Sequence, residues 1–422
     1  MYTKTFTRMD ARQLSGDNEL HQCAKNHRRI QLKQSYSQDE INATNLQGDT
    51  PLITAVKQRA FAVMKQLIDR KADLNLQDQR GNTALHIAVD EQEFPTITAL
   101  VDANADCTIL NKKGESAIHL DAALPDPRIL KILLETSLHA RMNAEARNAD
   151  RETPLFIAVK RQRARTAAWL ARMEINLLAT DKDGNTPLHC ATLLRNSLLT
   201  RITMHPTAMG QRNNEGDIPI MLAVKTGKGE VVESLLLSPS QLDPLDRHGN
   251  TLLHLACIPE DNTILNFFLK RKLFAREEKN AEGATPLHLA CKRNNLNAAK
   301  TLALYDATIN TVDHLGQTPL MASINNANYE MSDFLLRYPI GGAAASVNAQ
   351  DYSGTTALHL CAIYNNIQTV RLLMEYAANP NIENQNGQTA ATIIWSSGAH
   401  QLDEIFVDVE TTQDPLSQED QM

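Results

Sequence analysis

The sequence predicts an all-α fold made of about twelve short helical units stacked along the chain. Three observations support this prediction. A motif related to Thr-Pro-Leu-His recurs along the chain, its copies begin 32 to 38 residues apart, and a glycine-containing turn precedes most of them. A single short pair of helices cannot bury its apolar stripe, so units with this period are stabilised by packing on their neighbours.

The motif is clearest in three copies, which begin at Thr83 (TALHIA), Thr186 (TPLH) and Thr285 (TPLHLA). Related copies bring the total to twelve and begin at Asn18, Thr50, Ser116, Thr153, Ile218, Thr251, Thr318, Thr356 and Thr389. We number the repeats 1 to 12 in chain order. The regular spacing is itself strong support for a repeat architecture.

Each repeat is expected to contain a turn, a first helix and a second helix. In a turn such as 78–81 (DQRG), glycine supplies a left-handed backbone conformation. The threonine that follows is placed to cap the first helix, and proline suits the first helical position because its missing N–H needs no partner there. The second helix carries apolar residues at i, i+3 and i+4 spacing, as at Val63, Met64, Leu67 and Ile68.

The TPLH motif, the D-x-x-G turns and closing segments such as 71–75 (KADLN) resemble the ankyrin-repeat family. The resemblance implies an elongated solenoid with β-hairpin fingers, whose inner helices and fingers form a concave face that binds partner proteins. We therefore expect an N-terminal extension at residues 1–15, an ankyrin-repeat solenoid at 16–398 and an acidic tail at 399–422.

Composition excludes several other classes of protein. The net charge of -7 and the pI of about 6.0 argue against binding to nucleic acid, which needs a basic surface. No apolar run reaches membrane-span length, and the first residues lack the apolar core of a signal peptide. The six cysteines form no C-x-x-C pair and are interpreted as reduced thiols. We expect a cytoplasmic, monomeric protein without cofactors.

Three departures from the repeat pattern are visible. Repeats 4 and 10 carry insertions near residues 137–143 and 341–346, which are either partner contacts or tolerated loops. In repeat 6, His205-Pro206 is expected to bend or shorten the second helix.

After Ser397 the chain has seven acidic residues and no Lys or Arg, as expected of a disordered, solubilising end. Such a tail also resembles the export signals of bacterial type IV effectors, so delivery into a host cell is an alternative function and location.

Two groups of residues suggest chemistry but fit the repeat better. Seven of the thirteen histidines occupy the TPLH position, and several cysteines follow them at positions of small buried residues. These pairs favour a structural role over a thiol protease or a metal site.

Residues 205–213 faintly resemble the Fic nucleotidyl transferase loop, but Met209 stands where that loop needs an acidic residue and Gln211 and Arg212 replace its glycine and asparagine. We predict that the chain is not an enzyme. An active site improvised on the solenoid is the remaining alternative.

The predicted partner-binding surface consists of the residues just after the first-helix motif and of the finger tips. At the first set of positions stand Lys57, Asp90, Lys160, Lys225, Lys292 and Asn325, four of which are basic. An acidic protein segment could be steered there, although an ordinary solvated face is the alternative. The predicted partner-binding residues are Lys57, Arg80, Lys160, Arg161, Arg163, Lys182, Lys225, Arg247, Lys292, Arg293 and Tyr352.

Overall fold

The computed structural model describes residues 16–27, 36–135, 144–173, 175–194, 196–236, 245–324, 329–337 and 345–397. The chain divides into two compact units, of which unit 1 ends at Asn214 and unit 2 begins at Glu215. Most of the two predicted insertions and the acidic tail lie outside the described residues. The predicted boundaries of extension, solenoid and tail therefore stay predictions.

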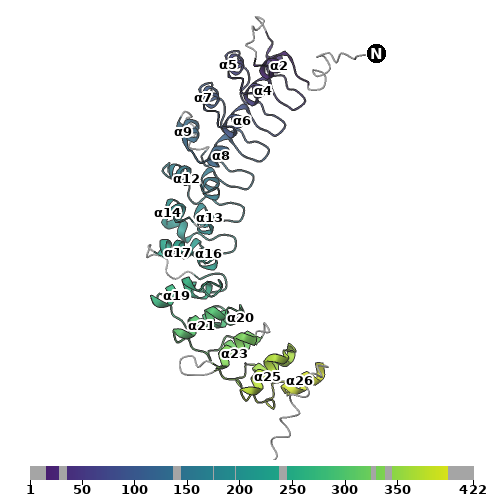
Figure 1. The fold of residues 1–422 in the computed structure, drawn as a ribbon, viewed down its shortest axis with the longest axis vertical. Helices are drawn as coiled ribbons and strands as arrows, with labels where there is room; N and C mark the ends of the chain where they lie inside the picture. The colour runs from purple at the N-terminus through teal and green to yellow at the C-terminus, as the bar shows by residue number, and fades with distance from the viewer. Residues whose placement is uncertain are drawn as a thin grey trace, which may run out of the picture. The chain divides into compact units, whose positions relative to one another are not determined.

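Unit 1 contains six repeats, each with one inner helix that begins after the motif's first residue. These inner helices are α2 (Glu19–Lys25), α4 (Pro51–Lys57), α6 (Ala84–Asp90), α8 (Ala117–Ala122), α11 (Pro154–Lys160) and α13 (Pro187–Leu193). Each packs on the next, and the second or outer helices form another row behind them (Figure 1). The outer row comprises α3 (Gln38–Ile41), α5 (Phe61–Asp69), α7 (Phe94–Asp102), α9 (Arg128–Glu135), α12 (Ala164–Ala171) and α14 (Ser197–Thr203).

Unit 2 repeats this arrangement with six further inner helices. They are α16 (Pro219–Lys225), α18 (Leu252–Leu255), α20 (Pro286–Lys292), α22 (Pro319–Ile324), α24 (Ala357–Ile363) and α26 (Ala390–Ser397). Its described outer helices are α17 (Gly229–Leu236), α19 (Thr263–Lys270), α21 (Leu296–Leu304), α23 (Tyr329–Arg337) and α25 (Ile367–Glu375). The twelve inner helices of the described residues confirm the predicted number of repeats.

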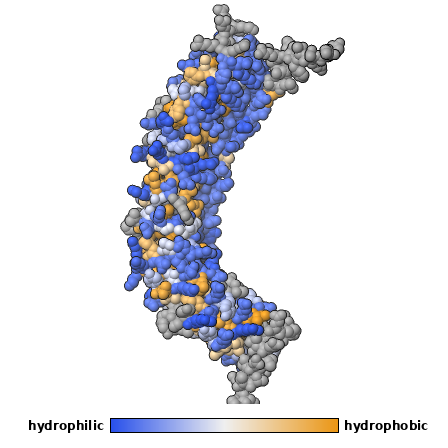
Figure 2. Space-filling view, viewed as in Figure 1, coloured by the Kyte–Doolittle hydropathy of each residue, from blue (hydrophilic) through white to orange (hydrophobic). Residues whose placement is uncertain are grey.

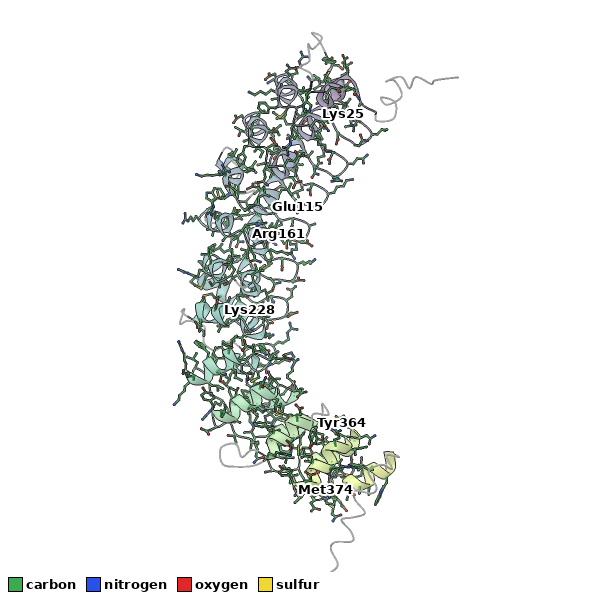
Figure 3. All side chains as sticks on the ribbon, viewed as in Figure 1. Lys25, Glu115, Arg161, Lys228, Tyr364 and Met374 are labelled. Carbon is green, nitrogen blue, oxygen red and sulfur yellow. The ribbon has the colours of Figure 1, made fainter. Side chains whose placement is uncertain are left out.

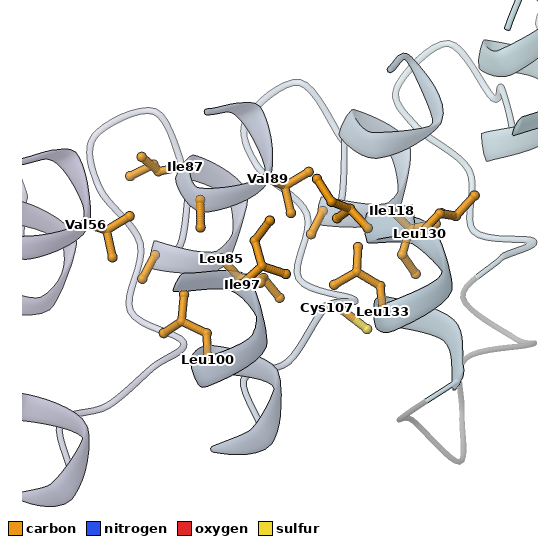
Figure 4. Packing of buried hydrophobic residues seen from close by; sticks show 14 of the residues in the cluster. Val56, Leu85, Ile87, Val89, Ile97, Leu100, Cys107, Ile118, Leu130 and Leu133 are labelled. Atoms are coloured by element: carbon orange, nitrogen blue, oxygen red, sulfur yellow. The ribbon is translucent and has the colours of Figure 1, made fainter. Parts of the chain in front are cut away.

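The core of each unit runs between neighbouring repeats rather than forming one central cluster. In unit 1, Leu85 of α6 and Leu100 of α7 are fully buried, as are Ile118 of α8 and Leu130 of α9 (Figure 4). Full burial of each such side chain contributes roughly 2 kcal/mol. No isolated repeat could bury these residues, so stacking supplies the stability.

The fingers are turns rather than paired strands. In the finger of repeat 3, the N–H of Asp78 donates to the carbonyl of Asn82, and the N–H of Gly81 donates to the carbonyl of Asp78. Adjacent fingers are joined by single bonds such as that from the Lys112 N–H to the Arg80 carbonyl. In the described part of the chain the β-structure consists of one bridge, between Gln350 and Thr356. The helical fold class is confirmed.

The irregular end of repeat 6 also follows the prediction. Helix α14 ends at Thr203, and the single-turn helix α15 (Pro206–Gly210) follows it. Proline occupies the first position of α15, where its lack of an N–H has no cost. The side chain of Met209 is buried, which explains why the loop carries an apolar residue there.

Candidate functional site

The histidines of the motif hold neighbouring repeats together. In repeat 3, the backbone N–H and the hydroxyl of Thr83 donate to Nδ1 of His86, at 3.1 and 2.8 Å. The opposite ring nitrogen, Nε2, then carries the proton and donates to the carbonyl of Glu115 in repeat 4, at 3.1 Å. His254 and His288 make the corresponding bonds in unit 2. Each of these three histidines therefore caps its own helix and is hydrogen-bonded to the next repeat.

Burial lowers the pKa of the imidazoles of His86, His119 and His254. A charged ring would lose the acceptor at Nδ1, so the neutral form suits the site. The bonds account for the histidines as structural groups. Among the described residues, no group of His, Cys, Asp and Glu side chains is arranged to hold a metal ion.

The cysteines also have structural positions. None of the six forms a disulfide within the described residues, and Cys257, Cys291 and Cys361 are completely buried. Burial raises the pKa of the Cys190 thiol to about 11, so this group is protonated at neutral pH and is a poor nucleophile. In the segment that resembles a Fic loop, His205 is exposed and accepts a hydrogen bond from the backbone N–H of Thr207. The buried Met209 supports the structural interpretation.

The side of each unit formed by the fingers and the ends of the inner helices is the candidate functional site, and we call it the finger side. Two positions of each repeat lie on it. The pre-cap position is the residue before the first residue of the motif, such as Asp49, and the rim position is seven residues after that first residue, such as Lys57. On unit 1 the finger side is largely hydrophilic (Figure 2).

Acidic pre-cap residues pair with lysines at the rim position of the same repeat. Lys57 lies 2.6 Å from Asp49, and Lys160 lies 2.6 Å from Glu152. Lys225 lies 2.7 Å from Asp217, and Lys25 also pairs with Asp17. Lys57 reaches the next finger as well, 3.2 Å from Asp78. These rim lysines are therefore largely neutralised within the protein, and the basic stripe suggested by the sequence is weaker than its residues imply.

The other predicted binding residues are spread over several locations. Arg161 and Arg293 are exposed beside the rim lysines, and Lys292 pairs with Glu282 at 3.2 Å. Arg163 precedes the outer helix α12, where its Nε donates to the carbonyl of Ala123. The remaining four lie on finger tips, namely Arg80, Lys182, Arg247 and Tyr352. Asn325 is outside the described residues. The predicted set thus does not form one patch.

A groove of about 990 Å³ lies on the finger side of unit 1, across repeats 2 to 4. Its lining includes the finger-tip cations Arg80, Lys112 and Lys113. It also includes five acidic residues, which are Asp49, Asp78, Asp90, Glu91 and Glu115. Arg59 neutralises Glu91, at 3.2 Å, and Lys57 is shared by Asp49 and Asp78. The groove therefore presents both cationic and acidic side chains, and the cations come from the finger tips.

The finger side of unit 2 is different in the last repeats. Rim residue Ile363 and its neighbour Tyr364 (Figure 3) are 55% and 51% exposed at the end of α24. Trp395 of α26, which packs on α24, is also 55% exposed, but it occupies the helix position at which Val89 and Cys291 are buried between repeats rather than the rim position. The finger tips add Leu315 and Tyr352, which are joined by a backbone hydrogen bond. We call these five residues the apolar surface of unit 2.

Sequence reasoning missed both the paired lysines and most of the apolar surface. The first had a readable signal, because an acidic residue precedes a lysine by eight positions in repeats 1, 2, 5 and 7. The second could have been found by aligning the rim positions, where Ile363 stands in place of lysine. The exposure of Trp395 had no such signal, because tryptophan on a helix can equally face the core.

Comparison with known proteins agrees with this architecture. A model of ankyrin repeats in three copies matches residues 20–111, 118–202, 220–313, 260–351, 305–384 and 340–405. The mouse B-cell lymphoma 3 protein homolog is 32% identical over 218 residues, which are 50% of this chain and 48% of that protein. The chicken nuclear factor NF-kappa-B p105 subunit is 30% identical over 214 residues, which are 48% of this chain and 21% of that protein.

The human SH3 and multiple ankyrin repeat domains protein 2 is 28% identical over 191 residues, 45% of this chain and 10% of that protein. The matches thus span about half of the mouse relative and smaller parts of the other two.

No helix in the described residues is both long and apolar enough to cross a membrane. The family model covers most of the chain, and the capping histidines and glycine turns supply its structural basis. This chain belongs to the ankyrin-repeat family.

Proposed function

We propose that the protein is a protein–protein interaction scaffold that binds a partner through its finger side. The groove in repeats 2 to 4 carries this proposal, because it combines an open volume of about 990 Å³ with charged side chains from three successive fingers. A protein segment lying across the fingers could contact all three repeats. The motif residues behind the groove are buried among the packed helices. The exposed residues of the finger side can therefore vary without disturbing that packing.

Arg80 and Lys112 supply the sharpest test of this function. Both are exposed finger-tip residues of the groove, and their side chains make no ion pair within the described residues. Charge reversal in Arg80→Glu with Lys112→Glu should leave folding intact and reduce capture of partner proteins by about tenfold. Quantitative mass spectrometry after affinity capture measures the change.

A matched control places the same charge change on the opposite face. Lys65 is exposed on the outer helix α5, and Lys65→Glu should leave the captured proteins unchanged. If the finger-tip variant retains every partner of the wild type, binding through this part of the finger side is wrong.

The predicted effector function is the alternative, and its sequence support lies in the tail outside the described residues. Fusion of the last 25 or so residues to a reporter tests it in a bacterium with a type IV secretion system. Export of the fusion would support delivery into a host cell, and retention would eliminate it. Cytoplasmic location and a monomeric state stay proposals, the second measurable by light scattering.

An improvised enzyme is a weaker alternative. The titratable groups that the sequence suggested for chemistry are used as caps and core residues, as His86 and Cys291 illustrate. The groove itself combines charged side chains without a pair of groups arranged as nucleophile and base. Its geometry favours binding.

A further inference from the structure

Repeat 4 keeps an acidic pre-cap residue but lacks the lysine that should neutralise it. Its pre-cap residue is Glu115, and its rim position holds Ala123. Repeats 1, 2, 5 and 7 have both members of the pair, and in all four the side chains meet. The carboxylate of Glu115 makes no ion pair within the described residues. Repeat 4 therefore presents the acidic half of a pair that is complete in four other repeats.

The neighbouring repeat strengthens the negative charge at this point. Repeat 3 carries Asp90 at its rim position, where lysine would otherwise stand, and Asp90 also makes no ion pair in the described part of the chain. Both Asp90 and Glu115 line the groove. Glu115 is half-buried beside the His86 side chain, which binds its backbone carbonyl. Because partial burial weakens screening by solvent, a cation entering here would be held more strongly than on an open surface.

The finger tips are positively charged and therefore favour acidic residues of a partner. The finger-tip residues Arg80, Lys112 and Lys113 also line the groove. A purely basic segment would be repelled by these three cations, and a purely acidic one would be repelled by Asp90 and Glu115. Electrostatic complementarity therefore favours a segment with both signs in a defined order.

We propose that the groove binds a protein segment in which one lysine or arginine side chain pairs with Glu115, while flanking acidic residues contact the finger tips. This partner rests on the proposed function and specifies its chemistry. The partner's cation takes the place that a rim lysine occupies in repeats 2 and 5. The groove thus recognises its partner by completing an ion pair that the protein leaves open.

The decisive variant is Ala123→Lys, which supplies the missing lysine within the chain. It should fold at least as stably as the wild type, because it recreates the pair of Lys57 with Asp49. A library of displayed peptides of about 12 residues is selected against the full chain. Enriched peptides should contain Lys or Arg flanked by Asp or Glu, and fluorescence anisotropy should show that Ala123→Lys weakens their binding about tenfold.

Glu115→Gln provides a second route, because it removes the charge without adding a competitor, and it should weaken the same peptides. Leu193→Lys is the matched control. It adds lysine at the rim position of repeat 6, whose pre-cap residue is the neutral Asn185, and it lies outside the groove. Binding to this variant should equal binding to the wild type.

The outcomes separate the two proposals. If enriched peptides bind Ala123→Lys and Glu115→Gln as tightly as the wild type but lose affinity for Arg80→Glu, the finger side binds proteins and the open ion pair is wrong. If enriched peptides lack a basic residue, the proposed partner is also wrong. If no peptide is enriched, or none responds to any finger-side variant, binding through this groove fails as well.

Discussion

The two units expose different side chains on the same frame, by which we mean the stacked inner and outer helices. Both units have rim lysines, such as Lys57 and Lys225, but unit 1 has the charged groove of repeats 2 to 4, whereas repeat 11 of unit 2 exposes Ile363 at its rim position. The frame behind these positions is the same, as the caps of Thr83 in unit 1 and Thr356 in unit 2 show. Rim residues can vary because their side chains extend beyond the packed helix face. The exposed side chains of a repeat can therefore change while its helices stay the same.

Asp121 of unit 1 is the residue whose replacement should change the stability of a unit most. It is fully buried in α8, and burial raises the pKa of its carboxyl to about 7, although a backbone hydrogen bond from Leu130 offsets part of this effect. The same position in unit 2 holds Ala290 in repeat 9. The folded protein holds the proton more tightly than the unfolded chain. The favourable contribution of the protonated form is therefore fully present below pH 4 or so and is lost as the pH rises through 7.

Asp121→Ala should stabilise unit 1 by roughly 4 kcal/mol at pH 8 and by little at pH 4. Urea unfolding followed by circular dichroism at both pH values measures this. The reverse change, Ala290→Asp, should destabilise unit 2 with the same pH dependence. A gain from Asp121→Ala that is equal at both pH values would contradict the role of the charge.

Finger glycines provide the next comparison. A Cβ atom on Gly81, whose φ is +79°, would lie 2.7 Å from the backbone nitrogen of Lys112 in the next finger. Gly387 of unit 2 has a φ of +69° but no atom within 4 Å of the same point. Gly81→Ala should cost about 2 to 3 kcal/mol of unfolding free energy and Gly387→Ala about 1 kcal/mol, because only the first adds a clash to the strain. Equal losses in thermal unfolding would show that finger stacking contributes nothing.

The rim lysines should differ in proportion to their burial. The Lys225 and Asp217 side chains are 28% and 1% exposed, whereas those of Lys292 and Glu282 are 61% and 56% exposed. Lys225→Met should cost about 2 kcal/mol, because it removes a partner from a buried carboxylate. Lys292→Met should cost less than about 0.5 kcal/mol. Urea unfolding compares them directly, and a larger loss for Lys292→Met would refute this ranking.

The apolar surface of unit 2 should have the smallest effect on stability. Tyr364→Ser combined with Trp395→Ser should change the unfolding free energy by less than about 1 kcal/mol, because both side chains are about half exposed. The double variant should bind less of the fluorescent dye ANS, which reports exposed apolar surface. Leu46→Ser in unit 1 is the control, since Leu46 is an exposed residue outside this surface. Unchanged dye binding by the double variant would show that the residues form no common surface.

The sequence by itself determined the frame of this protein. The period predicted the number of repeats, and Thr-Pro-Leu-His predicted where each inner helix begins, since a hydroxyl cap and an N-terminal proline act within a few residues. The same locality explains why His205-Pro206 correctly predicted the break after α14. The histidines could be identified as structural, but their bonds to the following repeat became visible only with the repeats stacked.

Tertiary structure decided which charges are available on the finger side. In sequence, Lys57 and Lys160 are cations, but folding places each beside an acidic residue on a preceding turn. The same folding leaves Glu115 without a lysine and puts it into one groove with Asp90 and Arg80. Whether two charges meet depends on distances through space, which residue type alone does not specify. The frame is encoded by local contacts, whereas the candidate site depends on what stacking brings together.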